Sequence, residues 1–134
     1  MNGTQELKVA VAQFMVRREP EWNLDIIDGY AWQAADAGAR LLVLPEGLIA
    51  RDGDDDMFAA AHAQPLDGPF VTGLRRISEE RHITLMGTVH AVLGAADAVP
   101  DKPASCATDS RVSNVFVVIR ERGSYRDLSE AASL

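Results

Sequence analysis

Short apolar segments alternate with amphipathic ones along most of this chain. Residues 8–14 and 41–44 are predominantly apolar, which is typical of β-strands inside a sheet. Between them, apolar residues recur at helical spacing over 24–35 and form one stripe. Strand, helix and strand joined by short connections predict a βαβ unit with parallel strands.

The ends of the predicted helix carry recognisable signals. Glu19-Pro20-Glu21 would begin it with a proline in the first turn and acids near the positive end of the helix dipole. Asn23 is an alternative capping residue, because asparagine side chains accept hydrogen bonds from the first backbone N–H groups of a helix. Gly38 lies where a helix C-terminus favours a left-handed residue.

A second helix and two further strands follow the first unit. Turn residues over 64–69 precede a helical stripe that begins at Phe70. Apolar strands are expected over 83–90 and 113–120, separated by a long loop over 91–111 that has no periodicity. This order of elements predicts an α/β fold in one domain.

The strand over 41–44 ends in Pro45, Glu46 and Gly47. Its consecutive aliphatic residues predict a strand buried on both faces, and Pro45 ends the ladder because it has no N–H to donate. Glu46 then lies just past the carboxyl end of a central strand, where open α/β sheets bind their ligands. Glu46 is therefore the candidate site residue. We interpret His90, at the end of the next strand, as a structural histidine with satisfied hydrogen bonds.

The acidic run at 52–56 invites a calcium-site interpretation. It lacks the spaced ligands and the terminal glutamate of an EF-hand loop, so we predict no metal site there. We interpret the run as a solvated loop, followed by a short helix over 57–63. His62 on that segment is expected to be structural.

Composition narrows the functional classes. The formal net charge of -7 and the pI near 4.8 argue against sequence-independent nucleic-acid binding, which needs clustered lysine and arginine. Cys106 is the only cysteine, so no intrachain disulfide can form and a reducing compartment fits. No segment approaches the roughly 20 apolar residues that span a bilayer. We therefore expect a cytoplasmic protein with neither a nucleic-acid nor a membrane partner.

Several motifs occur in a characteristic order along the chain. They are Val9-Ala10-Val11-Ala12-Gln13-Phe14, Asn23, Ala37-Gly38-Ala39, Leu42-Val43-Leu44-Pro45-Glu46, Pro65-Leu66-Asp67-Gly68-Pro69, Gly87-Thr88, and Ser113-Asn114 before an apolar strand. Together they resemble the nitrilase superfamily of carbon–nitrogen hydrolases over roughly residues 8–123. The continuation from Glu46 to Asp52 is similar to the branch of deaminated-glutathione amidases and omega-amidases.

The resemblance implies a fold and a chemistry. The fold is the N-terminal portion of a four-layer α-β-β-α sandwich, and the reaction is hydrolysis of a small carboxylic acid amide to acid and ammonia. A Glu-Lys-Cys triad without metal or cofactor would carry it, with Glu46 as the general base. Complete members of the family associate, so a homo-oligomer is implied for the complete enzyme.

The family's lysine and cysteine have no counterpart in this sequence. The lysine follows the fourth strand in the family, and this chain has none after Lys102. Cys106 precedes that strand and cannot be carried over as the nucleophile; nothing near it in the sequence would lower its pKa. We therefore expect the truncated chain to be inactive, with Glu46 as the one triad member present.

The segment after Gly123 departs from the family pattern, since 124–134 are polar and lack alternation. One choice of codons that encodes residues 123–134 was also read one base later. In that frame it encodes Glu-Val-Ile-Ala-Ile-Tyr-Arg-Lys-Leu-His-Leu, which is a return strand with the missing lysine motif. Glu130 followed by Ala131 allows only lysine or arginine in that frame. We hypothesise that 1–123 are the N-terminal part of a carbon–nitrogen hydrolase domain and that 124–134 are an aberrant, frameshifted tail.

Two other functional classes remain open at this point. The chain would be a small α/β binding or regulatory domain if it held a phosphate in a glycine-rich loop, but residues 13–20 contain no glycine. It would be a non-functional fragment if its sheet lacked the layer that should cover it, since an exposed apolar sheet face promotes aggregation.

Overall fold

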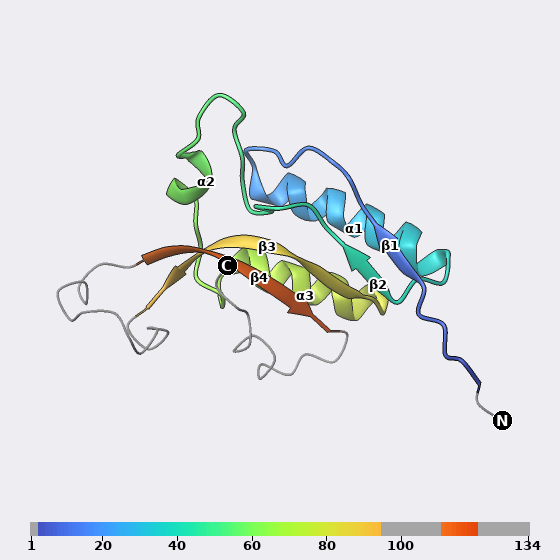
Figure 1. Ribbon diagram of the computed structural model, residues 1–134. Helices are drawn as coiled ribbons and strands as arrows, with labels where there is room; N and C mark the ends of the chain where they lie inside the picture. Colours follow the sequence, from blue (N-terminus) through green and yellow to red (C-terminus); the bar gives the residue numbers. More distant parts are fainter. Residues whose placement is uncertain (1–2, 95–110, 121–134) are drawn as a thin grey trace.

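Two helices cover one face of a mixed β-sheet in the computed structural model, which describes residues 3–94 and 111–120 (Figure 1). The strands are β1 (Val9–Val11), β2 (Leu41–Val43), β3 (Thr84–Leu93) and β4 (Arg111–Ile119), and the helices are α1 (Pro20–Asp36), α2 (Phe58–Ala61) and α3 (Pro69–Arg81). Within the described residues the sheet order is β1-β2-β3-β4. β1, β2 and β3 run parallel to one another, and β4 is antiparallel to β3. The predicted α/β class is confirmed.

The first βαβ unit forms as the apolar pattern predicts. Val9 pairs with Leu41 in parallel register, and α1 connects the two strands. Helix α1 begins with Pro20 in its first turn after Glu19, so the alternative start at Asn23 is wrong. Gly38 follows the helix at φ 86°, in the left-handed region that glycine adopts without strain.

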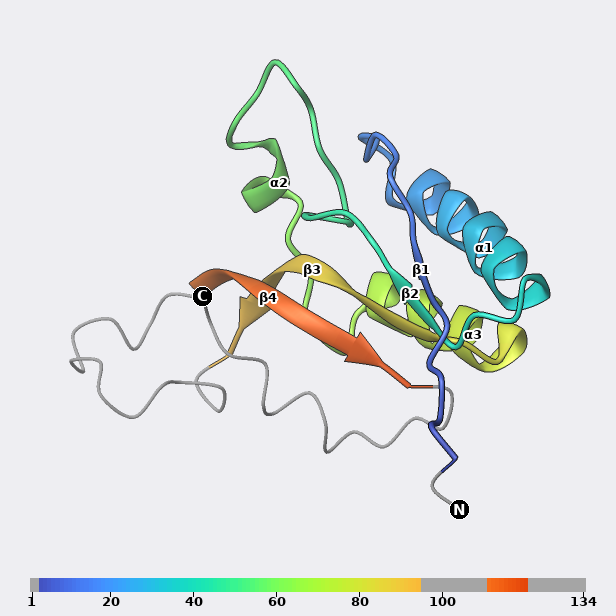
Figure 2. The same cartoon turned by 45° about the vertical axis from the view of Figure 1, so that its right-hand side comes forward.

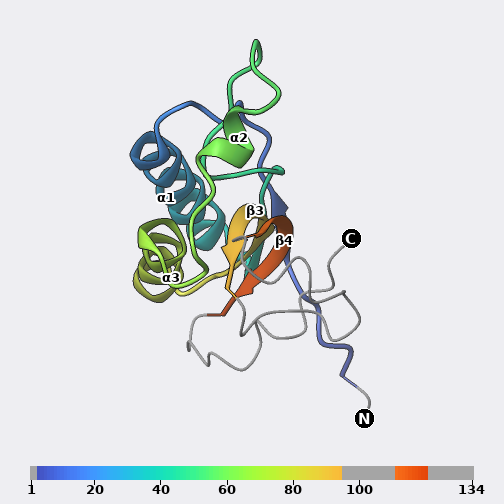
Figure 3. The same cartoon turned by 90° about the vertical axis from the view of Figure 1, so that its left-hand side faces the viewer.

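Burial on the sheet is one-sided, which corrects the prediction that β2 is buried on both faces. Leu42 is 1% exposed beneath the helices, whereas its neighbours Leu41 and Val43 are half-buried on the opposite face. Figure 3 shows α1 and α3 together on one side of the strands. On the other face, Val9 and Val11 are 45% and 67% exposed. A strand can therefore carry aliphatic side chains on both faces while the described residues cover only one of them.

The two long helices contact each other as well as the sheet. An added Cβ at Gly73 of α3 would lie 2.6 Å from Cδ1 of Leu24 on α1, so glycine permits their close approach. The guanidinium of Arg81 donates to the Asp28 carboxylate at 2.8 Å. This hydrogen bond holds the pKa of the Asp28 carboxyl below its usual value.

The segment boundaries differ from expectation around the predicted loop at 91–111. β3 continues to Leu93 and β4 already begins at Arg111, because Leu93 and Arg111 pair across the antiparallel ladder. Cys106 and the tail at 124–134 lie outside the described residues. In the part of the chain that the structure describes, no helix is long and apolar enough to cross a membrane.

Candidate active site at the carboxyl end of β2

Glu46 lies at the rim of a polar hollow beyond the end of β2. The cavity volume is about 250 Å³, and the carboxylate-bearing side chain of Glu46 is exposed to solvent. The hollow is lined by Glu46, Gly47, Arg51, Asp52, Asp55, Asp56, Ala59, His90 and Asn114. The predicted location of Glu46, past the carboxyl end of a central parallel strand, is confirmed.

The backbone on either side of Glu46 is fixed against β3. Gly47 has φ 62° and donates its N–H to the Thr88 hydroxyl at 2.9 Å. Leu48 donates its N–H to the Thr88 carbonyl at 2.9 Å. A Cβ added at Gly87 would lie 2.7 Å from Leu48, so the loop rests directly on the β3 backbone. These contacts hold the backbone next to Glu46 against β3, while the Glu46 carboxylate stays exposed to solvent.

Asn23 ties together the two loops that approach the hollow. Its amide group donates to the carbonyls of Arg17 and Ile49 at 2.9 Å each, and its oxygen accepts the Arg17 N–H at 2.7 Å. Asn23 is fully buried. The backbone N–H of Arg51 adds a bond of 3.0 Å to the Arg17 carbonyl. A predicted helix cap is therefore a buried clamp between the loop after β1 and the loop that carries Glu46.

His90 faces the same hollow. The sequence had suggested a structural histidine with satisfied hydrogen bonds at the end of a strand, and this interpretation is wrong. It lies within β3 and pairs with Asn114 of β4 rather than ending the strand. Its Nδ1 atom is buried and has no hydrogen-bond partner among the described residues. The imidazole Cε1 lies 3.5 Å from the position that a Cβ at Gly47 would take, so the ring lies beside Gly47, next to Glu46 in the chain.

Burial, with a smaller contribution from the positive charge of Arg51, lowers the pKa of His90 below its usual value of 6.5. In the pH window between the folded and unfolded pKa values, the unfolded chain binds more protons, so the free energy of unfolding falls as the pH drops. We expect the Cε1–H resonance of His90 to titrate below about pH 6.5. We also expect His90→Gln to flatten the pH dependence of stability in that window. A titration midpoint at or above the ordinary value would contradict this environment.

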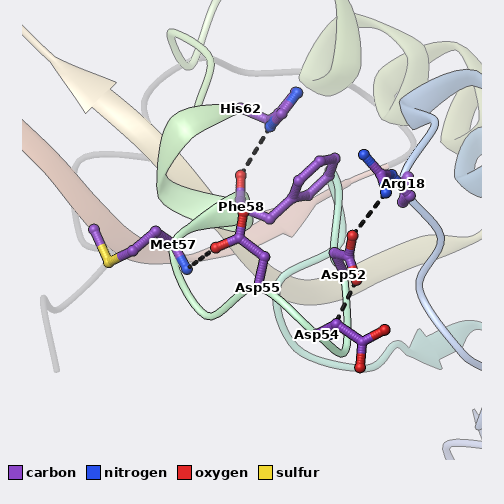
Figure 4. Close-up of polar contacts among 7 residues, drawn as sticks. All are labelled: Arg18, Asp52, Asp54, Asp55, Met57, Phe58 and His62. Atoms are coloured by element: carbon purple, nitrogen blue, oxygen red, sulfur yellow. Dashed lines mark hydrogen bonds and ion pairs between the residues drawn. The ribbon is translucent and has the colours of Figure 1, made fainter.

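The acidic loop is solvated as predicted, since Asp54, Asp55 and Asp56 are exposed, and specific contacts hold Asp52 in place. Asp52 pairs with Arg18 at 2.8 Å and accepts the Asp54 N–H, and its side chain is only 18% exposed (Figure 4). The Arg18 guanidinium carbon lies 4.7 Å from the centroid of the Phe58 ring, which stacks on His62 at 4.0 Å. The loop is thereby fastened to the segment after β1.

A short helix follows the acidic loop, as the sequence predicts. Asp55 accepts the Met57 N–H ahead of α2, which is shorter than the predicted helix over 57–63. The His62 Nδ1 lies 2.9 Å from the Phe58 carbonyl oxygen, a contact internal to the turn. Within residues 3–94 and 111–120, no group of three or more histidine, cysteine or acidic side chains could hold a metal ion.

Chemically, the described part of the hollow offers proton acceptors and one cation. Glu46, Asp52, Asp55 and Asp56 contribute carboxylates, and Arg51 contributes the positive charge. None of the described lining residues is a cysteine, serine or lysine. This arrangement can accept a proton from a polar group, and it presents no nucleophile of its own.

Sequence comparisons relate the chain to hydrolases. No family model matches it. It is 32% identical over 111 residues to the hydrolase Rv0480c of Mycobacterium tuberculosis, covering 83% of this chain and 34% of that protein. It is 40% identical over 82 residues to the deaminated glutathione amidase of Escherichia coli O157:H7, covering 61% of this chain and 31% of the amidase. The chain thus spans about a third of the length of the curated relatives it matches.

Solved structures share the fold at lower identity. A CN-hydrolase superfamily protein from Xanthomonas campestris superposes with a TM-score of 0.66 at 20% identity, over 90% of this chain and 39% of its own. An amidase from Nesterenkonia sp. AN1, in complex with butyramide, superposes with a TM-score of 0.58 at 22% identity, over 95% of this chain and 41% of its own.

Proposed function

Because the chain belongs to the carbon–nitrogen hydrolase (nitrilase) superfamily, we propose that it supplies the general base of an amidase-type site. The base is Glu46, and the substrate is a small carboxylic acid amide that is hydrolysed to acid and ammonia. The observation that carries this proposal is the position of Glu46 at the rim of a polar hollow, on a backbone anchored to β3.

In the proposed reaction, Glu46 accepts the proton of a cysteine thiol, and the thiolate attacks the amide carbonyl. A lysine stabilises the oxyanion that forms, ammonia departs, and water releases the acid from the acyl-enzyme. Neither group comes from the described lining of the hollow. We propose that residues 1–123 are the N-terminal part of the hydrolase domain and that the lysine and cysteine belong to sequence outside it.

We expect this chain by itself to release no ammonia from small amides such as deaminated glutathione, because an exposed carboxylate without a nucleophile does not cleave an amide at a measurable rate. The measurement is a coupled ammonia assay on the purified chain and on Cys106→Ala. Turnover that survives Cys106→Ala would contradict the Glu-Lys-Cys mechanism.

The nucleotide sequence beyond the codon for Arg122 tests the proposed origin of the tail. We expect a frame shifted by one base to continue into a strand, the lysine motif and later a Cys-Tyr-Asp segment. If neither shifted frame encodes such a continuation, the frameshift hypothesis is wrong, while the assignment of Glu46 is unaffected.

A further inference from the structure

The outward side of α1 carries a regular stripe of exposed residues. Trp22, Asp25, Gly29, Trp32 and Asp36 follow one another at spacings of three and four residues, so they line one side of the helix. All of them are exposed, with Trp22 at 58% and Trp32 at 54%. We call these residues the tryptophan stripe. Figure 2 shows α1 at the right-hand edge of the molecule, with no described element outside it.

Gly29 lies at the centre of the stripe, and packing within the described chain does not require glycine there. Glycine in a helix interior is less favourable than alanine. At Gly73 and Gly87 an added Cβ would lie 2.6 Å from Leu24 and 2.7 Å from Leu48, so packing within the chain requires glycine there. At Gly29 an added Cβ would meet no atom within 4 Å. The helix therefore has an open notch at this position.

The two tryptophans flank this notch. Positions 22 and 32 are about 15 Å apart along the helix axis at the usual rise per residue. Single exposed apolar side chains are common on protein surfaces. Two exposed indoles on one side of a helix, with a notch between them, instead present the aromatic side chains that contribute most at the centre of interfaces.

The charges on the stripe select the kind of partner. Helix α1 contains no lysine or arginine, and Asp36 lies in its last turn, where an acid opposes the helix dipole. A second copy of this chain, with its net charge of -7, would bring acids against acids. Lysine and arginine side chains would instead pair with Asp25 and Asp36 and stack on the indoles.

We propose that the tryptophan stripe is the docking surface for a helix of another protein that carries lysine or arginine side chains and places an apolar side chain in the notch at Gly29. The alternating spacing of three and four residues is the spacing at which two helices pack along a seam. This proposal is independent of the amidase chemistry, because the stripe shares no residue with the hollow at Glu46.

Tryptophan emission provides a direct test, since Trp22 and Trp32 are the only tryptophans in the sequence. The probe is a synthetic helical peptide of alanine, leucine and lysine, and the control probe is the same peptide with glutamate in place of lysine. We expect a saturable blue shift with the lysine peptide and no change with the glutamate peptide.

Variants separate docking from general attraction between opposite charges. Gly29→Leu fills the notch and should weaken lysine-peptide binding at least about tenfold. The same change should raise the Tm, because leucine favours the helix more than glycine does. Asp25→Asn with Asp36→Asn should weaken binding about threefold. The matched control, Asp54→Asn with Asp67→Asn, removes the same charge from exposed loop positions and should leave binding nearly unchanged.

Three results would overturn the proposal. Binding of the lysine peptide to Gly29→Leu as tight as to the unchanged chain would exclude the notch. Weakening of binding by the loop control as large as by the stripe variant would leave only net charge as the cause. A dimer in sedimentation that Gly29→Leu abolishes would identify a second copy as the occupant.

Discussion

Glu46→Gln should lower amide hydrolysis by at least about a hundredfold in an enzyme that combines this chain with a family lysine and cysteine. Glutamine keeps the size and hydrogen-bonding capacity of the side chain but cannot accept a proton. A suitable enzyme is a chimera in which residues 8–120 replace the matching part of the Escherichia coli deaminated glutathione amidase. Ammonia release from small amides gives kcat and KM for the chimera and for its variant.

A matched substitution distinguishes the loss of a base from a general disturbance. Glu79→Gln makes the same chemical change at an exposed position on α3 and should leave kcat within a factor of about two. In this chain by itself, Glu46→Gln should leave the Tm unchanged, because Glu46 is exposed. A chimera that keeps its activity after Glu46→Gln would remove Glu46 from the proposed triad.

The local elements of this fold could be predicted because their signals are local. The helical stripe from Phe70 correctly predicted α3. Gly38 has the positive φ that its place after α1 predicts. Likewise, a run of aliphatic residues after a helix correctly predicted that β2 is a strand parallel to β1. Each of these depends on residues that are neighbours along the chain.

The sidedness of the sheet depends on residues far apart in sequence, so the apolar run at 41–44 could not reveal it. Leu41 and Val43 look as buried as Leu42 in the sequence, yet α1 and α3 lie on the same face. Only the packing of both helices, fixed in part by Gly73, decides which face is covered.

Within the site, the sequence identified Glu46 but not its surroundings. His90 lines the hollow two residues after Thr88, which receives the Gly47 N–H, and no pattern in the sequence reveals this pairing of the loop with β3. Asn23 did leave a signal. It lies on the same helical stripe as Ile27 and Ala31, where a polar residue must find buried partners. The partners themselves, in two separate loops, could not be named in advance.

Asn23→Ala should destabilise the fold by on the order of 3 kcal/mol, the largest loss we expect from one side chain outside the apolar core. The substitution removes three hydrogen bonds and leaves the Arg17 N–H and the Arg17 and Ile49 carbonyls without their partner. Buried polar groups without partners retain their full desolvation cost. Urea unfolding of the chain, followed by circular dichroism, measures the change.

Gln33→Ala is the matched control, because Gln33 is an exposed amide on the same helix and should change stability by less than about 0.5 kcal/mol. Asn23→Asp sharpens the test. It preserves shape and can still accept the Arg17 N–H, but it turns a carboxylate toward the two carbonyl oxygens, so it should be no more stable than Asn23→Ala. Hydrogen exchange should show lost protection first at the Arg51 N–H, which bonds to the clamped Arg17 carbonyl. Equal stability of Asn23→Ala and Gln33→Ala would mean that the loop bearing Glu46 is held by its contacts with β3 alone.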